Sequence, residues 1–189
     1  MAKVFIDSSS LLQDSFRVAS KVYQDGFRPD FIVGIWRGGA PIGIAVQEFF
    51  EYKNAPTDHI AVRTSSYYGI NQQNKEIKVH GLHYLVENAN ANDKLLIVDD
   101  VFDSGRSIEA LINQIHGLMR LNAPKDMRIA TPYYKPKNNR TISQMVPDYY
   151  VHESEEWLVF PHELSGLTKE EIVEGKQELS PILDILFED

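Results

Sequence analysis

One stretch of thirteen residues, Leu95–Ser107, constrains the fold of this chain more than any other. It opens with an uninterrupted apolar run, which is typical of a strand buried on both faces of a parallel sheet. The run ends at two adjacent carboxylates, Asp99 and Asp100, and a third carboxylate, Asp103, follows shortly after. A loop of small residues with one cation, residues 104–107, then leads into apolar residues at helical spacing. The stretch therefore predicts a strand, an acidic corner, a loop and a helix.

The corner between this strand and this helix is suited to a phosphate ester. Open α/β sheets bind their ligands at the carboxyl ends of parallel strands, where this corner would lie. A loop of small residues at the start of a helix presents free backbone N–H groups and the positive end of the helix dipole, and both favour an anion. The carboxylates beside it can hold a metal ion or sugar hydroxyls. We therefore expect a phosphate site next to an acidic site.

Segments typical of strands and of helices alternate along the rest of the chain. Apolar runs predict strands at residues 31–35, 60–63, 77–79, 127–134 and 149–151. Apolar residues at helical spacing predict helices at residues 11–23, 42–52 and 108–119. The capping-box pattern of Thr168 and Glu171 predicts a helix that begins there, and residues 178–187 are expected to form another. The alternation predicts an α/β fold with a mainly parallel sheet flanked by helices.

Three features interrupt this pattern. Pro132 lacks a backbone N–H group, so we expect its strand to lie near an edge of the sheet. Residues 64–76 are polar and predict a long mobile loop. Residues 157–161 are expected to form an apolar turn.

Composition and charge argue against several classes of protein. The net charge of −8 disfavours broad nucleic-acid binding, which needs a basic face. The chain has no cysteine, so it forms neither disulfides nor a thiolate metal site. We see no signal-peptide pattern and no apolar run of membrane-spanning length, and we expect a cytoplasmic protein. An acidic protein that binds a phosphate ester must supply positive charge locally, from a few Arg and Lys or from a metal.

The phosphate-binding loop matches none of three common patterns. A Walker A loop needs Gly-Lys-Ser/Thr, and the glycines at residues 38–43 have the wrong spacing for a dinucleotide fingerprint. The acidic pair of a phospho-receiver domain belongs nearer the start of the chain. The string Val98–Ser107 instead resembles the signature with which type I phosphoribosyltransferases bind PRPP (5-phosphoribosyl 1-pyrophosphate). The resemblance is closest to the bacterial and archaeal hypoxanthine and xanthine-guanine phosphoribosyltransferases.

This resemblance implies a role for each residue of the stretch. Asp99 and Asp100 would contact the ribose hydroxyls, directly or through Mg²⁺, and Asp103 would be the general base that accepts the purine N7 proton. Residues 104–107 would wrap the 5′-phosphate. The implied PRPP ligands are therefore Asp99, Asp100, Asp103, Ser104, Gly105, Arg106 and Ser107.

A second loop, Arg37-Gly38-Gly39, follows the strand expected at residues 31–35. Taken alone it is typical of a tight turn whose glycines allow a positive φ. Beside the first motif, it resembles the pyrophosphate-binding loop of the same enzymes. The polyanionic leaving group needs backbone N–H donors, an arginine fork and no obstructing side chain. We therefore expect Arg37, Gly38 and Gly39 to bind pyrophosphate.

The polar segment that follows resembles the flexible catalytic loop of the same family at Ser66 and Tyr67. Such a loop would act as a lid that excludes water from the reactive sugar cation. An ordinary surface loop is the alternative, because polar composition is common to both.

Two downstream segments resemble the purine-binding parts of the family. Lys135 would donate to the 6-oxo group of a purine, and the alternative is a solvated surface lysine. In the hood segment, Trp157 would stack on the base and the backbone of Leu158 would contact the base edge, whereas a core tryptophan is the alternative. Glu163 falls near a family position for an acid that binds a second metal, although residue type and spacing differ.

These features together predict a purine salvage enzyme. It would transfer the phosphoribosyl group from PRPP, with Mg²⁺, to N9 of a free purine base: hypoxanthine, guanine or xanthine. We expect one domain over residues 1–189 with the type I phosphoribosyltransferase fold, a flexible lid loop, a small hood from about 136–166 and a C-terminal helical extension at 167–189. A homodimer or homotetramer is expected, without nucleic-acid or membrane partners.

Two alternatives remain open at this point. One is a PRPP-sensing regulator that binds nucleic acid, against which the acidic charge argues. The other is a phosphoribosyltransferase for another base. Lys135 argues against adenine, because an ammonium group cannot accept a hydrogen bond from a 6-amino group.

Overall fold

The computed structural model describes residues 3–68 and 75–188, with the side chains of 66–68 and 75–76 left aside. The chain forms two compact units, one made of Met1–Gln13 with Glu156–Asp189 and the other of Asp14–Glu155. Among the described residues, no helix combines the length and apolar character needed to cross a lipid bilayer. The single domain, hood and C-terminal extension expected from the sequence stay predictions.

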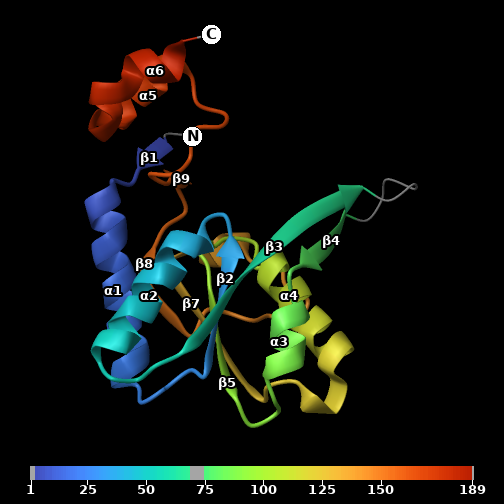
Figure 1. Ribbon diagram of the computed structural model, residues 1–189. Helices are drawn as coiled ribbons and strands as arrows, with labels where there is room; N and C mark the ends of the chain where they lie inside the picture. The colour runs from blue at the N-terminus through green and yellow to red at the C-terminus, as the bar shows by residue number, and fades with distance from the viewer. Residues whose placement is uncertain (1–2, 69–74, 189) are drawn as a thin grey trace. The chain divides into compact units, whose positions relative to one another are not determined.

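The larger unit is built on a mainly parallel sheet (Figure 1). In the described part of the chain this sheet has seven strands, hydrogen-bonded in the order β4-β3-β2-β5-β7-β6 with β8 also paired to β7. β5 and β6 pair with successive parts of one side of β7, and β8 pairs with its opposite side. All pairs are parallel except β3 with β4. The strands are β2 (Phe31–Trp36), β3 (Asp58–Tyr68), β4 (Lys75–His80), β5 (Lys94–Val98), β6 (Val101–Phe102), β7 (Asp126–Tyr134) and β8 (Tyr149–Glu153). The α/β class expected from the alternating pattern is confirmed.

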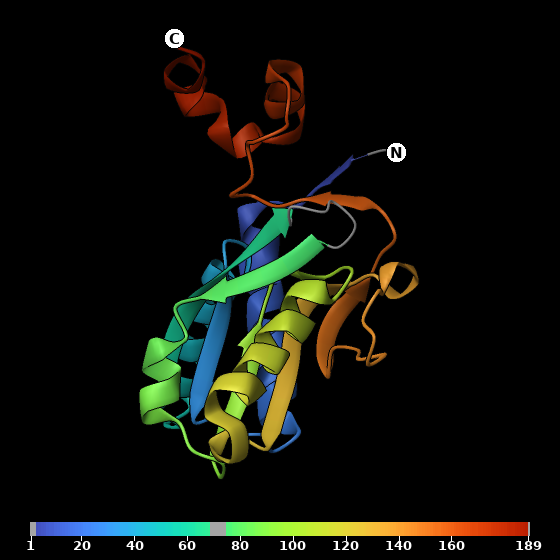
Figure 2. The ribbon, with the colours of Figure 1, turned by 90° about the vertical axis from the view of Figure 1, so that its right-hand side faces the viewer.

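Helices cover both faces of this sheet. Figure 2 shows α3 and α4 over one face, while α2 and the part of α1 in this unit lie over the other. Short 3₁₀ turns, η1 (Arg120–Asn122) and η2 (Pro136–Asn138), follow α4 and β7. The helices are α1 (Ser8–Gln24), α2 (Gly39–Tyr52), α3 (His83–Asn88) and α4 (Arg106–Met119).

The core follows from the two periodicities. Alternate residues of β2 and β5 point to opposite faces of the sheet, and both sets are buried, so these central strands have no polar face. On the face of α4, the strand residues pack with helix residues spaced three or four apart. This cluster includes Val33, Ile35, Leu95, Ile97, Ile108, Leu111, Ile115 and Met119.

The long loop expected at residues 64–76 is wrong at both of its ends. β3 runs to Tyr68 and β4 begins at Lys75, and the two form an antiparallel ladder that reaches from Arg63–His80 to Tyr68–Lys75. Residues 69–74 lie outside the described residues. A two-stranded ribbon is held by its own backbone hydrogen bonds, so its sequence needs no apolar run to mark it.

The expected position of Pro132 near an edge is confirmed, because β7 lies next to the edge strand β8, although β7 is itself paired on both sides. Pairing with β5 ends at Ala130 and pairing with β6 begins at Tyr133. Pro132 therefore lies opposite the break between β5 and β6, where a missing N–H group costs no ladder bond on that side. That break holds Asp99 and Asp100.

The smaller unit pairs the start of the chain with its end. β1 (Lys3–Phe5) and β9 (Trp157–Val159) form a parallel two-stranded sheet, so the apolar turn expected at 157–161 is wrong over its first residues. The capping box is confirmed, because the Thr168 hydroxyl and the Glu171 carboxylate accept from each other's backbone N–H groups. The helix expected over 178–187 divides at its middle. The remaining elements are α5 (Lys169–Gly175), η3 (Gln177–Ile182) and α6 (Leu183–Phe187).

Candidate active site at the carboxyl ends of the strands

The candidate site is built from loops that follow three strands of the larger unit. Arg37 and its glycines follow β2, the acidic pair follows β5, and Asp103 with residues 104–107 follows β6. These strands are parallel, so their carboxyl ends meet at one edge of the sheet. The structure thus brings together two motifs that are about sixty residues apart in the chain.

The glycine loop is shaped by a close approach to the acidic pair. A Cβ atom at Gly38 would overlap the Asp100 carboxylate, and one at Gly39 would overlap the carbonyl oxygen of Val98. Gly38 has a φ of −60°, so the alternative of a turn that uses the freedom of glycine for a positive φ does not apply to this residue. The glycines are required because the backbone passes directly against the acidic residues. The loop then starts α2, where the Ala40 N–H donates to the Arg37 carbonyl at 3.1 Å.

A short strand, β6, separates the pair Asp99 and Asp100 from Asp103, and it was not expected from the sequence. Asp99 and Asp100 fill the break between β5 and β6, where the Asp99 N–H donates to Ala130 and the Asp100 carbonyl accepts from Tyr133. β6 then resumes the pairing with β7 before the chain reaches Asp103. The pair therefore lies between two strands of the sheet, whereas Asp103 begins the loop that follows β6.

Asp99 and Asp100 lie against each other. The Asp100 side chain is buried and its backbone N–H donates to Asp99 Oδ1 at 3.0 Å. Burial, and next the negative charge of Asp100, raise the pKa of Asp99 well above its ordinary value. Two neighbouring carboxylates of this kind are stabilised by a nearby cation, because a positive charge offsets both their repulsion and their desolvation.

The pair fits a Mg²⁺ ion that is shared with a substrate. Over the described ranges, no cluster of three His, Cys, Asp or Glu side chains could hold a metal by itself. Mg²⁺ commonly uses one or two carboxylates and completes its shell with water and substrate phosphate oxygens. Asp99 and Asp100 match that donor set, with substrate oxygens as the remaining ligands.

The predicted phosphate-binding loop, residues 104–107, depends on Gly105. This residue has a φ of +71° and precedes the first residue of α4. A Cβ atom there would come within 2.5 Å of the Phe102 ring and of the Thr141 methyl group. The positive φ turns the chain into a helix of 14 residues, whose first N–H groups face the loop. The loop is therefore suited to an anion, as the sequence predicts.

Asp103 and Lys135, which are far apart in the chain, lie close together in the structure. The Lys135 side chain is buried at the end of β7, and its Nζ lies 3.8 Å from Asp103 Oδ2. Asp103 Oδ1 accepts a hydrogen bond of 2.8 Å from Asn138 Nδ2. Sequence reasoning missed Asn138, because an asparagine after proline and lysine is typical of an ordinary turn.

The remaining candidates are not joined to this cluster by the structure. Ser66 and Tyr67 belong to β3, and their side chains are not described. Trp157 and Leu158 belong to the smaller unit, where the exposed Trp157 ring lies 5.6 Å from Lys3 Nζ and Leu158 is buried. The Glu163 carboxylate accepts from the Phe160 N–H at 3.0 Å within its own turn.

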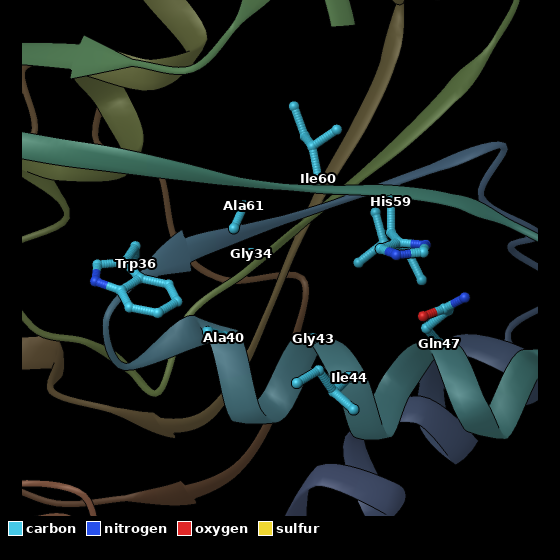
Figure 3. Close-up of a pocket in the computed structure, with 10 residues that line it drawn as sticks. Gly34, Trp36, Ala40, Gly43, Ile44, Gln47, His59, Ile60 and Ala61 are labelled. Atoms are coloured by element: carbon cyan, nitrogen blue, oxygen red, sulfur yellow. The ribbon is translucent and has the colours of Figure 1, made fainter. Parts of the chain in front are cut away.

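An apolar pocket of about 180 Å³ lies beside the glycine loop, between α2, β2 and β3. Figure 3 shows the Trp36 ring at one end of this pocket and Gln47 and His59 at the other. Its lining does not include the acidic pair, Asp103 or Lys135. The candidate site is therefore carried by the loops at the strand ends and not by this pocket.

An α/β sheet with an anion-binding loop and an acidic pair at its carboxyl edge defines a protein that binds a phosphorylated ligand. Residues 7–165 match the family described as "Phosphoribosyl transferase domain", and the chain belongs to this family. It is therefore an enzyme of the phosphoribosyltransferase class. The family generally uses Mg²⁺ with PRPP, which agrees with the acidic pair.

Known relatives include enzymes for different purines. The chain is 32% identical over 126 residues to the adenine phosphoribosyltransferase of Halothermothrix orenii, covering 60% of this chain and 71% of that protein. A purine phosphoribosyltransferase from Pyrococcus horikoshii is 26% identical with a TM-score of 0.68, over 89% of this chain and 98% of that one. The xanthine-guanine-hypoxanthine phosphoribosyltransferase of Helicobacter pylori shares the fold, with 20% identity, a TM-score of 0.65 and coverages of 84% and 92%.

Proposed function

We propose that this enzyme transfers the phosphoribosyl group of PRPP to N9 of a 6-oxopurine. The acceptor would be hypoxanthine, guanine or xanthine, and the products a nucleoside monophosphate and pyrophosphate. The observation that carries the proposal is the pairing of Lys135 and Asp103 at 3.8 Å. O6 and N7 are neighbours on one edge of a 6-oxopurine, so a donor for O6 and an acceptor for the N7 proton must also be neighbours.

The same pair argues for the oxo group over an amino group at position 6. An ammonium group carries donors only, and the 6-amino group of adenine is also a donor. With adenine opposite Lys135, two hydrogen-bond donors would face each other. Because Lys135 is buried, leaving its ammonium group without an acceptor is costly. Discrimination against adenine is therefore expected to be strong.

The loops at the strand ends supply the binding of PRPP in this proposal. Backbone N–H groups of residues 104–107 hold the 5′-phosphate, and Arg37 with the loop at Gly38 and Gly39 holds pyrophosphate. Asp99 and Asp100 would hold Mg²⁺ and the ribose hydroxyls. When bound, the ion neutralises the leaving pyrophosphate, which provides the positive charge that an acidic protein lacks.

Asp103 acts in the chemical step, as the general base. As the bond between C1 and the pyrophosphate oxygen breaks, the ribose gains positive charge, and nearby carboxylates stabilise it. N9 attacks C1, and the N7 proton passes to Asp103 as general base. Ser66 and Tyr67 would close over the sugar, while Trp157 would stack on the base and the Leu158 backbone would contact its edge.

The relative from Halothermothrix orenii favours adenine as a second candidate acceptor. One assay separates the two candidates: the protein with PRPP and Mg²⁺ is given each free base in turn, and nucleotide formation gives kcat/KM for each. We expect a 6-oxopurine to be the best substrate. A higher kcat/KM for adenine would overturn the assignment of Lys135, and turnover of no base would overturn the proposed function.

A further inference from the structure

We propose that Asn138 is a positioning residue for Asp103. Its amide holds one carboxylate oxygen, so that the other oxygen faces the base and stays at ion-pair distance from Lys135 without a hydrogen bond to it. This inference rests on the proposed function, because it assigns Asp103 and Lys135 to the same purine.

The segment that carries Asn138 is fastened to both sides of Asp103. Before Asp103, the carbonyl of Phe102 accepts from the Lys135 N–H at 2.9 Å. After it, the carbonyl of Ser104 accepts from the Arg140 N–H at 2.9 Å. The segment 135–140 therefore runs alongside residues 102–104, and Asn138 lies between the two fixed points.

The turn around Asn138 is itself held. The Asn138 N–H donates to the Lys135 carbonyl at 3.2 Å, which closes the 3₁₀ turn that begins at Pro136. The side chain of the next residue, Asn139, accepts from the N–H and hydroxyl of Thr141 and donates to the Met145 carbonyl. These bonds hold the turn from which the Asn138 amide reaches Asp103.

The two oxygens of Asp103 consequently have different surroundings. Oδ1 accepts the 2.8 Å hydrogen bond from Asn138, whereas Oδ2 forms an ion pair with Lys135 Nζ at 3.8 Å, which is beyond hydrogen-bond distance. The Asp103 side chain is 48% exposed, and the χ2 angle of an aspartate is broad when nothing restrains it. Without Asn138, the carboxylate is free to rotate toward the ammonium group and turn the 3.8 Å ion pair into a hydrogen-bonded one.

Such an ion pair would occupy both groups that the proposed mechanism needs. Lys135 would be turned from the 6-oxo group, and Asp103 would be a poorer acceptor for the N7 proton. A neutral amide is suited to prevent this, because it restrains the carboxylate without cancelling its charge. Loss of this restraint is therefore expected to weaken the use of the base and to leave PRPP binding unchanged.

The test compares wild type, Asn138→Ala, Asp103→Asn and the double variant under saturating PRPP and Mg²⁺. We expect Asn138→Ala to lower kcat/KM for the purine by about 10- to 100-fold, with the KM for PRPP unchanged. In the double variant it should cause no further loss beyond Asp103→Asn, because it acts through that carboxylate. Asn138→Asp keeps the shape and removes the donor, and it should lose at least as much activity.

Lys137→Ala is the matched control, since this exposed residue of the same turn is hydrogen-bonded through its backbone N–H. It should keep wild-type kinetics. If Asn138→Ala keeps kcat/KM within about threefold of wild type, or if its loss adds fully to that of Asp103→Asn, the positioning role is overturned while the proposed function stands. If the wild-type protein uses no purine, the proposed function fails and the inference fails with it.

Discussion

At the scale of single residues, the three carboxylates of the acidic stretch differ in their surroundings. Asp99 and Asp100 lie against each other in the break between β5 and β6, next to the glycine loop. Asp103 is half-exposed, with an amide and an ammonium group beside it. A coupled pair suits a cation, and a separate carboxylate near a donor suits proton transfer, so the surroundings support the division of roles in the proposed mechanism.

Asp103→Asn tests the role of the separate carboxylate. The amide keeps the shape of the side chain but cannot accept the N7 proton, so we expect kcat to fall by about 100- to 10,000-fold. Folding and PRPP binding should be unchanged, which circular dichroism and calorimetric titration with PRPP would measure. Wild-type turnover in this variant would remove Asp103 from the mechanism.

Asp99→Asn tests the cost of burying a negative charge next to Asp100. Burial raises the pKa of Asp99 above 3.8, so the folded state binds its proton more tightly than the unfolded state does. Protonated Asp99 therefore adds to the free energy of unfolding of the wild type at low pH. This contribution is lost as pH rises from the ordinary pKa of an aspartate through the raised pKa of Asp99. The variant carries no such charge, and melting temperatures without metal should show its advantage over wild type growing with pH. An advantage that is constant with pH would contradict this account.

At the scale of elements, the connection from β6 to α4 determines whether the proposed phosphate-binding loop can form. Gly105 turns the chain with a positive φ, and Phe102 and Thr141 pack where its side chain would be. The loop is also tied to the 135–140 segment by the bond from the Arg140 N–H to Ser104. The anion site is therefore supported by packing from outside the motif that marks it in the sequence.

Gly105→Ala should destabilise this connection. The left-handed conformation alone costs roughly 1–2 kcal/mol in an alanine, and the overlap with Phe102 and Thr141 adds to that cost. Urea denaturation should show the loss, and PRPP affinity should fall. Gly26→Ala is the matched control, because Gly26 has a φ of +81° with no atom within 4 Å of the added Cβ. Equal effects of the two variants on stability and PRPP affinity would contradict the packing argument.

In the smaller unit, the Lys176 side chain supports the segment that follows β9. Its side chain is buried, and Nζ donates to the carbonyls of Phe160 and Pro161 at 2.7 and 3.1 Å. Lys176→Met leaves two carbonyls without this donor, and we expect a loss of about 1–3 kcal/mol. Thermal unfolding of the full chain would measure it. Unchanged stability would show that water replaces the ammonium group at both carbonyls.

At the scale of the whole molecule, the sequence predicts the parts that depend on local pattern. The buried strands β2 and β5, the helix α4 and the capping box at Thr168 follow from apolar periodicity and cap chemistry. The family follows from the string Val98–Ser107, which is long and specific. These features are encoded in neighbouring residues, so a reader of the sequence finds them directly.

Other features depend on contacts between distant segments. The ladder of β3 with β4 is held by backbone bonds, which leave no mark in the side-chain pattern. Pro132 is tolerated in a strand that is paired on both sides because the break at the acidic pair lies opposite it. Asn138 reaches Asp103 across 35 positions of the chain, and its own neighbours indicate a turn. Periodicity carries no information on any of these three.

The central claim is that Lys135 and Asp103 together recognise a 6-oxopurine. A competition assay tests it most directly: hypoxanthine, guanine, xanthine and adenine are mixed at equal concentration with limiting PRPP, Mg²⁺ and the protein, and the nucleotides are separated by chromatography. We predict that the product is the monophosphate of one or more of the three 6-oxopurines, with adenosine monophosphate a minor product. Adenosine monophosphate as the main product, or no nucleotide at all, would contradict the account.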